Sequence, residues 1–337
     1  MLKILYDHQC FSNQDFGGIS RYFVELIKNI NKLDLAHANL SLVFSNNNYL
    51  TEIEGIKTKS FFKDKKFTGK VTLLNYINTP NTIIELLKND YDIFHPTYYR
   101  PYFLKFLSNK PFILTVHDMT HELYPQTVNR FDKTAKYKRI LVNKAKKIIA
   151  VSHNTKNDLI KILNVPEQKI EVIYLASSIE KKFAISKENF NLPDRYILYV
   201  GNRKWYKNFQ NLLLAFVKLS QIDDKLHLIC SGGGSFNSAE KIKFKEFGLT
   251  NKIIHKPADN VTLATLYANS LAFVFPSFYE GFGIPVIEAM NCDCPLVLSN
   301  VSSLPELAKD AAIYFDPKDV NDIISAISQV IFNEDYR

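Results

Sequence analysis

Short apolar runs alternate with helix-length amphipathic segments along the whole 337-residue chain, and this alternation restricts the fold more than any other feature. In the first half the alternation predicts strands at 3–7, 40–44, 91–95, 111–118, 147–152 and 170–174. It predicts helices at 17–33, 79–89, 130–147 and 152–163. Strands joined by helices pair in parallel and carry helices on both faces of the sheet. The first half is therefore predicted to be one doubly wound α/β domain.

The second half repeats this rhythm. Its predicted strands are 196–201, 226–230, 252–256, 271–275, 295–299 and 312–315, and its predicted helices are 207–220, 237–247, 260–270, 284–291 and 318–333. The polar stretch 177–194 lacks periodicity and is predicted to be a linker. The fold class is therefore α/β, with two tandem Rossmann-like doubly wound domains, 1–176 and 195–337. Such sheets bind ligands at the carboxyl ends of their strands, so we expect a site in a cleft between the domains.

The composition is that of an ordinary globular protein, with 46% hydrophobic and 23% charged residues. No stretch approaches the roughly 20 apolar residues of a membrane span, and the first residues lack the apolar core of a signal peptide. The four cysteines have neither metal-ligand nor redox spacing. We interpret them as reduced thiols, which favours a cytoplasmic location.

The net charge of +8 lies entirely in the first half, where 25 Lys and Arg oppose 16 Asp and Glu up to Ala176. The cations concentrate in 57–70 and 130–147, where they alternate with aromatic or aliphatic side chains. This pattern suits an anionic membrane surface, although a solvated loop and a helix with one wet face explain most charge runs. Nucleic acid is the weaker hypothesis because no recognition motif accompanies the charge.

The segment FPSFYEGFGIPVIEAM, 275–290, points most directly to chemistry. An apolar strand leads into a turn containing Gly281 and Gly283, and a helix begins near Pro285, where a missing N–H is harmless. Glycines let the backbone approach a ligand, and the helix N-terminus favours a phosphate. Glu280 would point into the cleft, and Glu288 is suited to ribose hydroxyls. On spacing alone, two surface glutamates around an ordinary turn fit equally well.

A second candidate follows the first strand of the second half, in GNRKWYKN, 201–208. Arg203, Lys204 and Lys207 lie where a loop meets a predicted helix. A helix N-terminus repels cations, so their placement there is unfavourable unless an anion is bound. A diphosphate would remove the conflict, whereas ordinary solvated cations are the alternative explanation.

Together these segments resemble retaining nucleotide-sugar glycosyltransferases of family 4, which have the GT-B fold. EGFGIPVIEAM resembles the family's E-x7-E signature, and GNRKWYKN resembles its Arg/Lys phosphate loop. DFGGISRY at 15–22, TVHDMTHELYP at 115–125, AVSHNTKNDL at 150–159 and LATLYANSLAFVFPS resemble further family segments in the expected order. The resemblance spans roughly residues 15–315, and six ordered segments are far more specific than one.

The resemblance implies a role for each matching residue on the donor side. Glu280 would contact the donor sugar and Glu288 the ribose. Arg203 and Lys207, with Lys204 sharing the task, would neutralise the diphosphate and stabilise the leaving group. Backbone N–H groups would be offered to the sugar and diphosphate by Gly281, Phe282 and Gly283.

In the first domain, the resemblance places His117 at the donor sugar, although a core or capping histidine is the plainer explanation of the residue itself. Gly17 and Gly18 would let the first loop approach phosphates or acceptor. Family members need no metal ion or other cofactor, and no credible D-x-D motif occurs in this sequence. No metal ligands are therefore expected.

The sequence also departs from the family pattern. Asn202 separates Gly201 from Arg203, where the arginine usually follows the glycine directly, and GGGS at 232–235 is either a nucleotide loop or a plain turn. The family's closing helix, which returns to the first domain, is expected to be missing or short.

These observations predict a retaining, metal-independent hexosyltransferase of bacterial capsule, O-antigen or lipopolysaccharide synthesis. Its partners would be a nucleotide-sugar donor and a glycan or polyprenyl-diphosphate-linked acceptor, and it would be peripheral at the inner face of the cell membrane. HDMTHELYP is most similar to mannosyl- and rhamnosyltransferases, which favours GDP-mannose. A non-catalytic nucleotide-sugar-binding subunit and another GT-B enzyme such as an epimerase are the alternatives. A dehydrogenase is disfavoured because no G-x-G-x-x-G follows the first strand.

Overall fold

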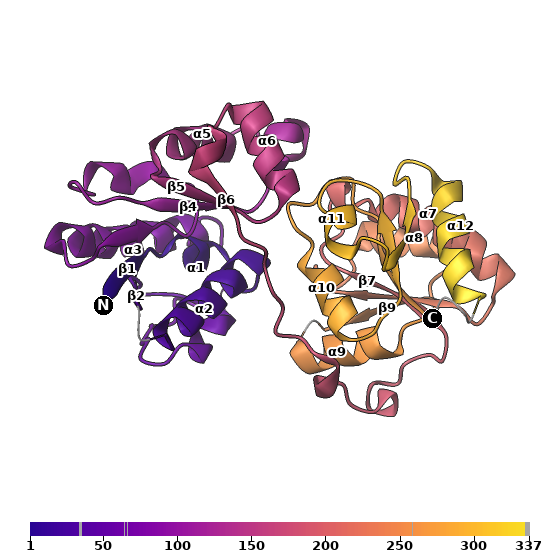
Figure 1. Ribbon diagram of the computed structural model, residues 1–337. Coiled ribbons are helices and arrows are strands. Elements are labelled where there is room, and N and C mark those ends of the chain that lie inside the picture. Colours follow the sequence, from indigo (N-terminus) through magenta and orange to yellow (C-terminus); the bar gives the residue numbers. More distant parts are fainter. Residues whose placement is uncertain (34–35, 64, 66, 258, 334–337) are drawn as a thin grey trace. The chain divides into compact units, whose positions relative to one another are not determined.

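The computed structural model describes residues 1–33, 36–63, 65, 67–257 and 259–333 and divides into two compact units (Figure 1). The first unit comprises Met1–Val151 and Thr155–Ile173, and the second comprises Ser152–Asn154 and Tyr174–Arg337. The segment 177–194, expected as a linker, lies within the second unit. It forms two 3₁₀ turns, Lys181–Phe183 and Lys187–Phe190, and Ile185 N donates to Thr265 Oγ1 at 3.1 Å.

The described residues of the first unit form six parallel strands in two groups, ordered β2-β1-β3 and β4-β5-β6. A parallel bridge between Phe94 and Phe112 connects the groups. The strands are β1 (Leu2–Tyr6), β2 (Ala36–Leu40), β3 (Ile93–His95), β4 (Ile113–Val116), β5 (Lys147–Ala150) and β6 (Ile170–Val172). The helices are α1 (Gln9–Asn13), α2 (Gly18–Asn31), α3 (Lys70–Lys88), α4 (Thr120–Leu123), α5 (Thr134–Lys144) and α6 (His153–Leu163).

The strand predicted at 40–44 is wrong, because β2 ends at Leu40. Beyond it, the Asn78 side-chain carbonyl accepts hydrogen bonds from Val43 N at 3.2 Å and Phe44 N at 3.0 Å. A buried amide from α3 thus satisfies backbone groups that a neighbouring strand would otherwise pair. Of the apolar residues in 40–44, Leu42 is buried and the other three are partly exposed, and the sequence did not indicate the partner of the backbone.

The helix predicted at 79–89 begins nine residues earlier, since α3 starts at Lys70 and runs through Pro80. A proline removes the hydrogen bond to the carbonyl four residues before it, here that of Tyr76. The Tyr76 side chain is 79% exposed, so this turn of the helix lies at the surface, where water can satisfy the carbonyl. Proline therefore interrupts the hydrogen-bond pattern without ending the helix.

The second unit is built on one six-stranded parallel sheet in the order β12-β11-β10-β7-β8-β9 (Figure 1). Its strands are β7 (Tyr196–Val200), β8 (His227–Ser231), β9 (Ile253–Lys256), β10 (Ala272–Phe275), β11 (Leu296–Ser299) and β12 (Ala312–Phe315). Its helices are α7 (Phe209–Ile222), α8 (Ser238–Glu246), α9 (Asn260–Asn269), α10 (Ile284–Asn291), α11 (Leu304–Ala308) and α12 (Val320–Ile331). Every residue of β7 is buried, and alternate residues enter hydrophobic clusters on opposite faces of the sheet.

The strand order places the switch point of the second sheet between β7 and β10. From β7 the chain moves outward through β8 and β9, then returns to β10 on the other side of β7. The helices that follow these two strands, α7 and α10, pack on opposite faces of the sheet. In open α/β sheets, ligands bind at the carboxyl ends of the strands at such a point. The segments that follow β7 and β10 are the two that the sequence marked, 201–208 and 276–283.

Candidate active site

The turn after β10 is held by two serines that precede α11. Glu280 N donates to Ser302 Oγ at 2.9 Å, and Ser303 Oγ donates to the carbonyl of Phe282 at 2.6 Å. Gly283 is the N-cap of α10 with φ 113°, and a Cβ there would lie 3.1 Å from Leu304 Cδ2. The left-handed angle and the packing both favour glycine at this position. The helix N-terminus is therefore held in place by contacts within the second unit.

Lys207 and Glu280 form an ion pair at the switch point. Lys207 Nζ donates to Glu280 Oε1 at 2.6 Å, and Ser277 Oγ donates to the same oxygen at 2.6 Å. Both of these hydrogen bonds reach Oε1 of the carboxylate. Both side chains are largely buried. Because a buried pair adds little stability relative to apolar residues, its position at a ligand-binding edge favours a functional role.

Arg203 lies in a different environment from Lys207. Its guanidinium pairs with the Glu240 carboxylate and donates to the carbonyls of Gly232 at 3.2 Å and Gly234 at 2.9 Å. Its Cζ also lies 4.9 Å from the Phe236 ring centroid. Arg203 therefore organises the GGGS loop, and the structure does not bring it against Glu280.

The cations of 201–208 do not lie at the first turn of α7. Lys207 ends the 3₁₀ turn Trp205–Lys207, and Asn208, in the left-handed region with φ 54°, separates it from α7. The Glu280 carboxylate neutralises Lys207, and the Glu240 carboxylate neutralises Arg203. These ion pairs stabilise both cations without a bound anion, which the sequence alone did not indicate. Lys204 is exposed at the start of the same turn.

Glu288 lies on α10 and is buried, with Tyr267 Oη donating to its Oε2 at 3.0 Å. Tyr267 comes from the buried side of α9, and burial followed by the adjacent Glu288 carboxylate raises the pKa of the Tyr267 hydroxyl well above its usual value. The tyrosine therefore stays protonated and fixes the carboxylate. Glu288 is therefore not the surface glutamate that the alternative explanation predicted.

In the first unit, His117 follows β4 and packs edge-on against Tyr22, with ring centroids 5.2 Å apart. Its backbone N–H donates to Tyr99 Oη at 3.2 Å. Burial lowers the pKa of the imidazole to about 4, with Asp118 opposing and Lys138 adding to the shift. His117 is therefore neutral near pH 7, and its buried Nε2 has no hydrogen-bond partner among the described residues.

Gly17 and Gly18 lie at the N-terminus of α2, with Gly17 as the N-cap in an extended conformation. The Gln14 side-chain carbonyl caps this helix by accepting from Ser20 N at 3.1 Å. A Cβ on Gly17 would lie 2.3 Å from Gln14 Oε1. The absence of a side chain at Gly17 therefore makes room for the capping Gln14 side chain, in addition to any ligand that binds there.

Sequence reasoning missed several residues that shape these sites. Ser277, Ser302 and Ser303 carry no pattern of their own and become informative only through their hydrogen bonds. Glu240 did carry a signal, because Asn237 and Glu240 have capping-box spacing. The structure contains that capping box at the start of α8, and Glu240 uses its second oxygen for Arg203.

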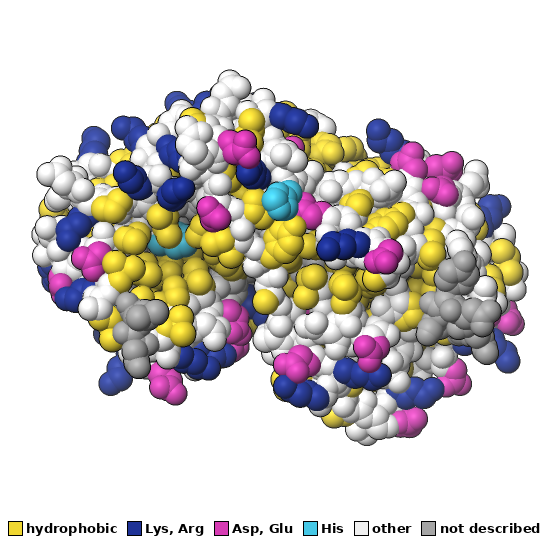
Figure 2. Space-filling model, in the orientation of Figure 1, with side chains coloured by type: hydrophobic (Ala, Val, Ile, Leu, Met, Phe, Trp, Pro, Cys, Tyr) yellow, Lys and Arg dark blue, Asp and Glu magenta, His cyan; other side chains and the backbone are white. Residues whose placement is uncertain are grey.

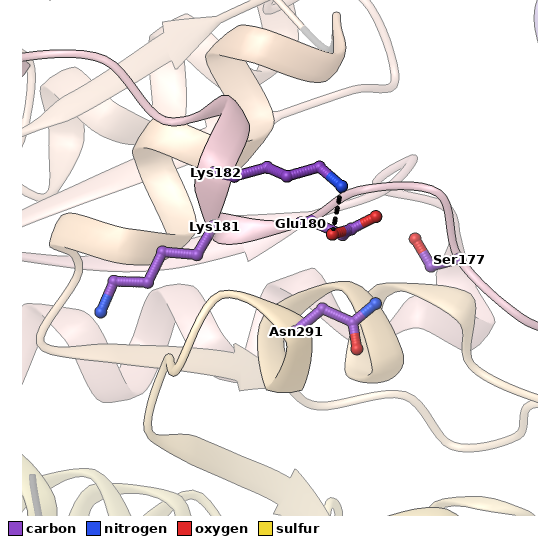
Figure 3. A pocket seen from close by; sticks show the side chains of 5 residues that line it. All are labelled: Ser177, Glu180, Lys181, Lys182 and Asn291. Atoms are coloured by element: carbon purple, nitrogen blue, oxygen red, sulfur yellow. Dashed lines mark ion pairs between the residues drawn. The ribbon is translucent and has the colours of Figure 1, made fainter.

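A polar pocket of about 390 Å³ lies elsewhere in the second unit, beside the end of α10 (Figure 3). Its lining residues are Ser177, Glu180, Lys181, Lys182 and Asn291. The two lysines are already paired, Lys182 with Glu180 at 2.7 Å and Lys181 with Asp293 at 3.0 Å. This pocket contains none of the predicted site residues.

The described residues contain neither a cluster of metal ligands nor a helix suited to a membrane span. No three or more His, Cys, Asp or Glu side chains within the described ranges are grouped as metal ligands. No described helix combines the length and the apolar character needed to cross a bilayer.

Comparison with known proteins agrees with this architecture. Residues 16–180 match the family model Glycosyltransferase Family 4, and residues 180–337 match Glycosyl transferases group 1. O-antigen chain mannosyltransferase B of Escherichia coli is 29% identical over 95% of this chain and 88% of that protein. O-antigen chain mannosyltransferase RfbU of Salmonella typhimurium is 30% identical over 64% of this chain and 60% of that protein. The structure of sucrose-phosphate synthase from Thermosynechococcus elongatus superposes with a TM-score of 0.77, at 18% identity over 100% of this chain and 91% of that one.

Two parallel-sheet units of this kind define the GT-B fold, and the second unit has a glycine turn and paired cations at its switch point. The chain belongs to glycosyltransferase family 4. It is accordingly a hexosyltransferase that retains the configuration of the transferred sugar, and the fold expected from the sequence is confirmed.

Proposed function

We propose that this glycosyltransferase moves mannose from GDP-mannose to a hydroxyl group of a growing bacterial surface polysaccharide, such as an O-antigen, carried on a polyprenyl diphosphate. The two relatives described above are named as O-antigen mannosyltransferases, which supports both the donor and the acceptor class. The Lys207–Glu280 pair beside the N-terminus of α10 carries the proposal, because it combines a cation, a carboxylate and a phosphate-type helix start at one switch point.

Each predicted site residue has a place in this proposal. Lys207, with Arg203 and Lys204, neutralises the diphosphate as it leaves, and this electrostatic stabilisation needs no metal ion. Glu280 Oε2 receives a hydroxyl of the donor sugar, and Glu288 receives the ribose. The turn 281–283 supplies backbone N–H groups, His117 takes part at the sugar, and the loop at Gly17 and Gly18 serves phosphates or acceptor.

We also propose that the first unit binds the anionic inner surface of the cell membrane through 57–70. Phe62 and Phe67 are 52% and 43% exposed and contact each other, with ring centroids 5.9 Å apart. Lys70 Nζ donates to the carbonyl of Phe62 at 2.7 Å, which holds the loop that presents these rings. Figure 2 shows hydrophobic side chains of the first unit gathered among Lys and Arg on the face in view. Exposed aromatic rings among cations suit the headgroup region.

Donor binding is tested first by thermal shift with GDP-mannose, GDP, UDP-glucose and UDP-galactose. A donor at 100 times its dissociation constant adds about 2.7 kcal/mol of apparent stability. GDP release and the anomeric configuration of the product, read by NMR, then test transfer. A larger shift with a UDP-sugar would overturn the mannose assignment, and binding without GDP release would favour a non-catalytic subunit.

Membrane binding is tested by flotation with vesicles of phosphatidylglycerol or phosphatidylcholine. We expect binding to the anionic vesicles only, and we expect F62S/F67S and K57Q/K63Q to weaken it. K241Q/K245Q is the matched control, because these lysines are exposed on α8 in the second unit. Equal binding to both vesicle types would overturn this part of the proposal.

A further inference from the structure

Lys138 is a buried lysine inside a stretch that the sequence presents as a basic surface. It lies on α5 and is 0% exposed, whereas its neighbours Lys133, Lys136 and Arg139 are exposed. The 130–147 stretch therefore offers one cation fewer to a membrane than its sequence indicates. A buried ammonium group carries a large desolvation penalty, so its partners indicate its role.

The partners of Lys138 surround the turn that carries His117. Its Nζ donates to the carbonyl of Asp118 at 2.8 Å and to Glu122 Oε2 at 2.8 Å. The ammonium also lies 5.1 Å from the ring centroid of Tyr99, whose hydroxyl accepts the His117 N–H. Lys138 thus contacts the carbonyl that follows His117 and the tyrosine that holds its backbone.

The energetics argue against a purely stabilising role for the Lys138–Glu122 pair. The exposed fractions of the two side chains are 0% and 5%. Apolar residues of similar volume usually replace such a pair without loss of stability. In addition, Glu122 Oε1 is buried and has no hydrogen-bond partner among the described residues. If the pair contributed to stability alone, each of its buried polar atoms would be expected to have a hydrogen-bond partner.

We propose that Lys138, with Glu122 as its counter-ion, is a positioning residue that holds the His117–Asp118 turn in the geometry required for sugar transfer. The inference rests on the role proposed above for His117, which it extends to a second layer of residues. Asp118 supports it, because its carboxylate accepts from Thr120 N at 3.0 Å and thereby closes the same turn over Lys138.

The test replaces both members of the pair, because K138M alone would leave Glu122 buried and unpaired. The variants are K138M/E122L, H117A, their combination, and K136M as the exposed control on the same helix. Three quantities are measured: the Tm, GDP release from GDP-mannose, and the imidazole resonances of ¹⁵N-histidine-labelled protein. H117A identifies the His117 signals in those spectra.

We expect K138M/E122L to keep the Tm of the wild type, to shift or broaden the His117 resonances, and to lower kcat roughly tenfold while the KM for GDP-mannose changes less than about twofold. Adding H117A to this variant should lower kcat less than it does in the wild type, because the two changes act on one unit. K136M should alter none of these quantities.

The experiment distinguishes failure of this inference from failure of the proposed function. Unchanged His117 resonances in K138M/E122L, or unchanged kcat while H117A is impaired, would overturn the inference alone. Full activity of H117A would overturn the role of His117 and the inference with it. A wild type that releases no GDP would refute the proposed donor, and the imidazole spectra would still decide whether Lys138 holds His117.

Discussion

Lys207 Nζ lies 2.6 Å from Glu280 Oε1, so a cation that follows β7 neutralises a carboxylate that follows β10. Arg203 and Glu240 form a comparable pair beside the glycine loop. Two of the three cations expected at a diphosphate, Lys207 and Arg203, therefore have carboxylate partners within the second unit. A bound donor must compete with Glu280 for Lys207, or share the cation with it.

Replacing Lys207 tests this relationship directly. We expect K207M to lower kcat/KM for GDP release by about 10²–10³-fold, because a preorganised charge at a leaving group contributes about that much. K207R should retain part of the activity, since the charge remains. K204M is compared with it, because Lys204 is exposed in the same turn and would only share this role, so a smaller loss is expected. A K207M enzyme within threefold of the wild type would contradict the assignment.

Glu240 offers a second test, because it serves both Arg203 and the capping box of α8. Glutamine keeps the hydrogen-bonding shape of the cap but loses the charge, whereas alanine loses both. We expect E240Q to lower the free energy of unfolding of the second unit by about 1.5–3 kcal/mol and E240A by roughly 1 kcal/mol more. Trp205, the only tryptophan in the sequence, reports this unit by fluorescence during urea unfolding. Equal losses in the two variants would show that the charge alone matters and that the cap contributes nothing.

The glycine loop after β8 contains a matched pair of positions. Gly233 and Gly234 have φ of 67° and 75°, but a Cβ on Gly233 would lie 2.8 Å from Asn202 Cα, whereas a Cβ on Gly234 would meet nothing within 4 Å. We expect G234A to cost about 1 kcal/mol from its left-handed backbone. G233A adds a backbone clash of roughly 1–3 kcal/mol and should displace the Arg203 loop. Urea unfolding compares the two, and similar losses would mean that the loop is not packed against Asn202.

The sequence predicted those elements that are buried because their own residues are apolar. β7 and β10 are apolar throughout, and the glycines and proline of 281–285 identify the turn and helix start that the structure contains. The prediction was wrong where a distant side chain decided the outcome. The N–H groups of Val43 and Phe44 donate to Asn78, and Phe44 forms an isolated parallel bridge with Lys59 in place of a strand.

The same limit applies to the site. Lys138 looks like its neighbours in the sequence, and only the packing of α5 against the β4 turn buries it. Asp7 is a similar case: it follows β1, is fully buried, and accepts from Thr97 N at 2.8 Å and Tyr102 Oη at 3.0 Å. Contacts between residues about 90 positions apart leave no local pattern to read.

Acid should destabilise the first unit through three histidines that the fold keeps neutral. Burial is the largest cause that lowers the pKa of His8 to about 4, of His95 to about 3 and of His117 to about 4. Unfolded histidines have pKa values near 6.5, so below that pH the unfolded chain binds protons that the folded unit does not. The stability contributed by these neutral imidazoles is complete above pH 6.5 and is lost as the pH falls toward 4.

The slope of the free energy of opening against pH is set by the number of protons that the unfolded chain binds and the folded unit does not. With three histidines, the free energy of opening should fall by at most about 4 kcal/mol per pH unit between roughly pH 6 and 4. Hydrogen exchange at pH 7.5 and 5.0, corrected for intrinsic rates, measures it in peptides from β1, β3 and β4. H37Q, at an exposed position near β1, is the control and should leave the slope unchanged. Equal protection of these strands at both pH values would show that the imidazoles are not held neutral by the fold.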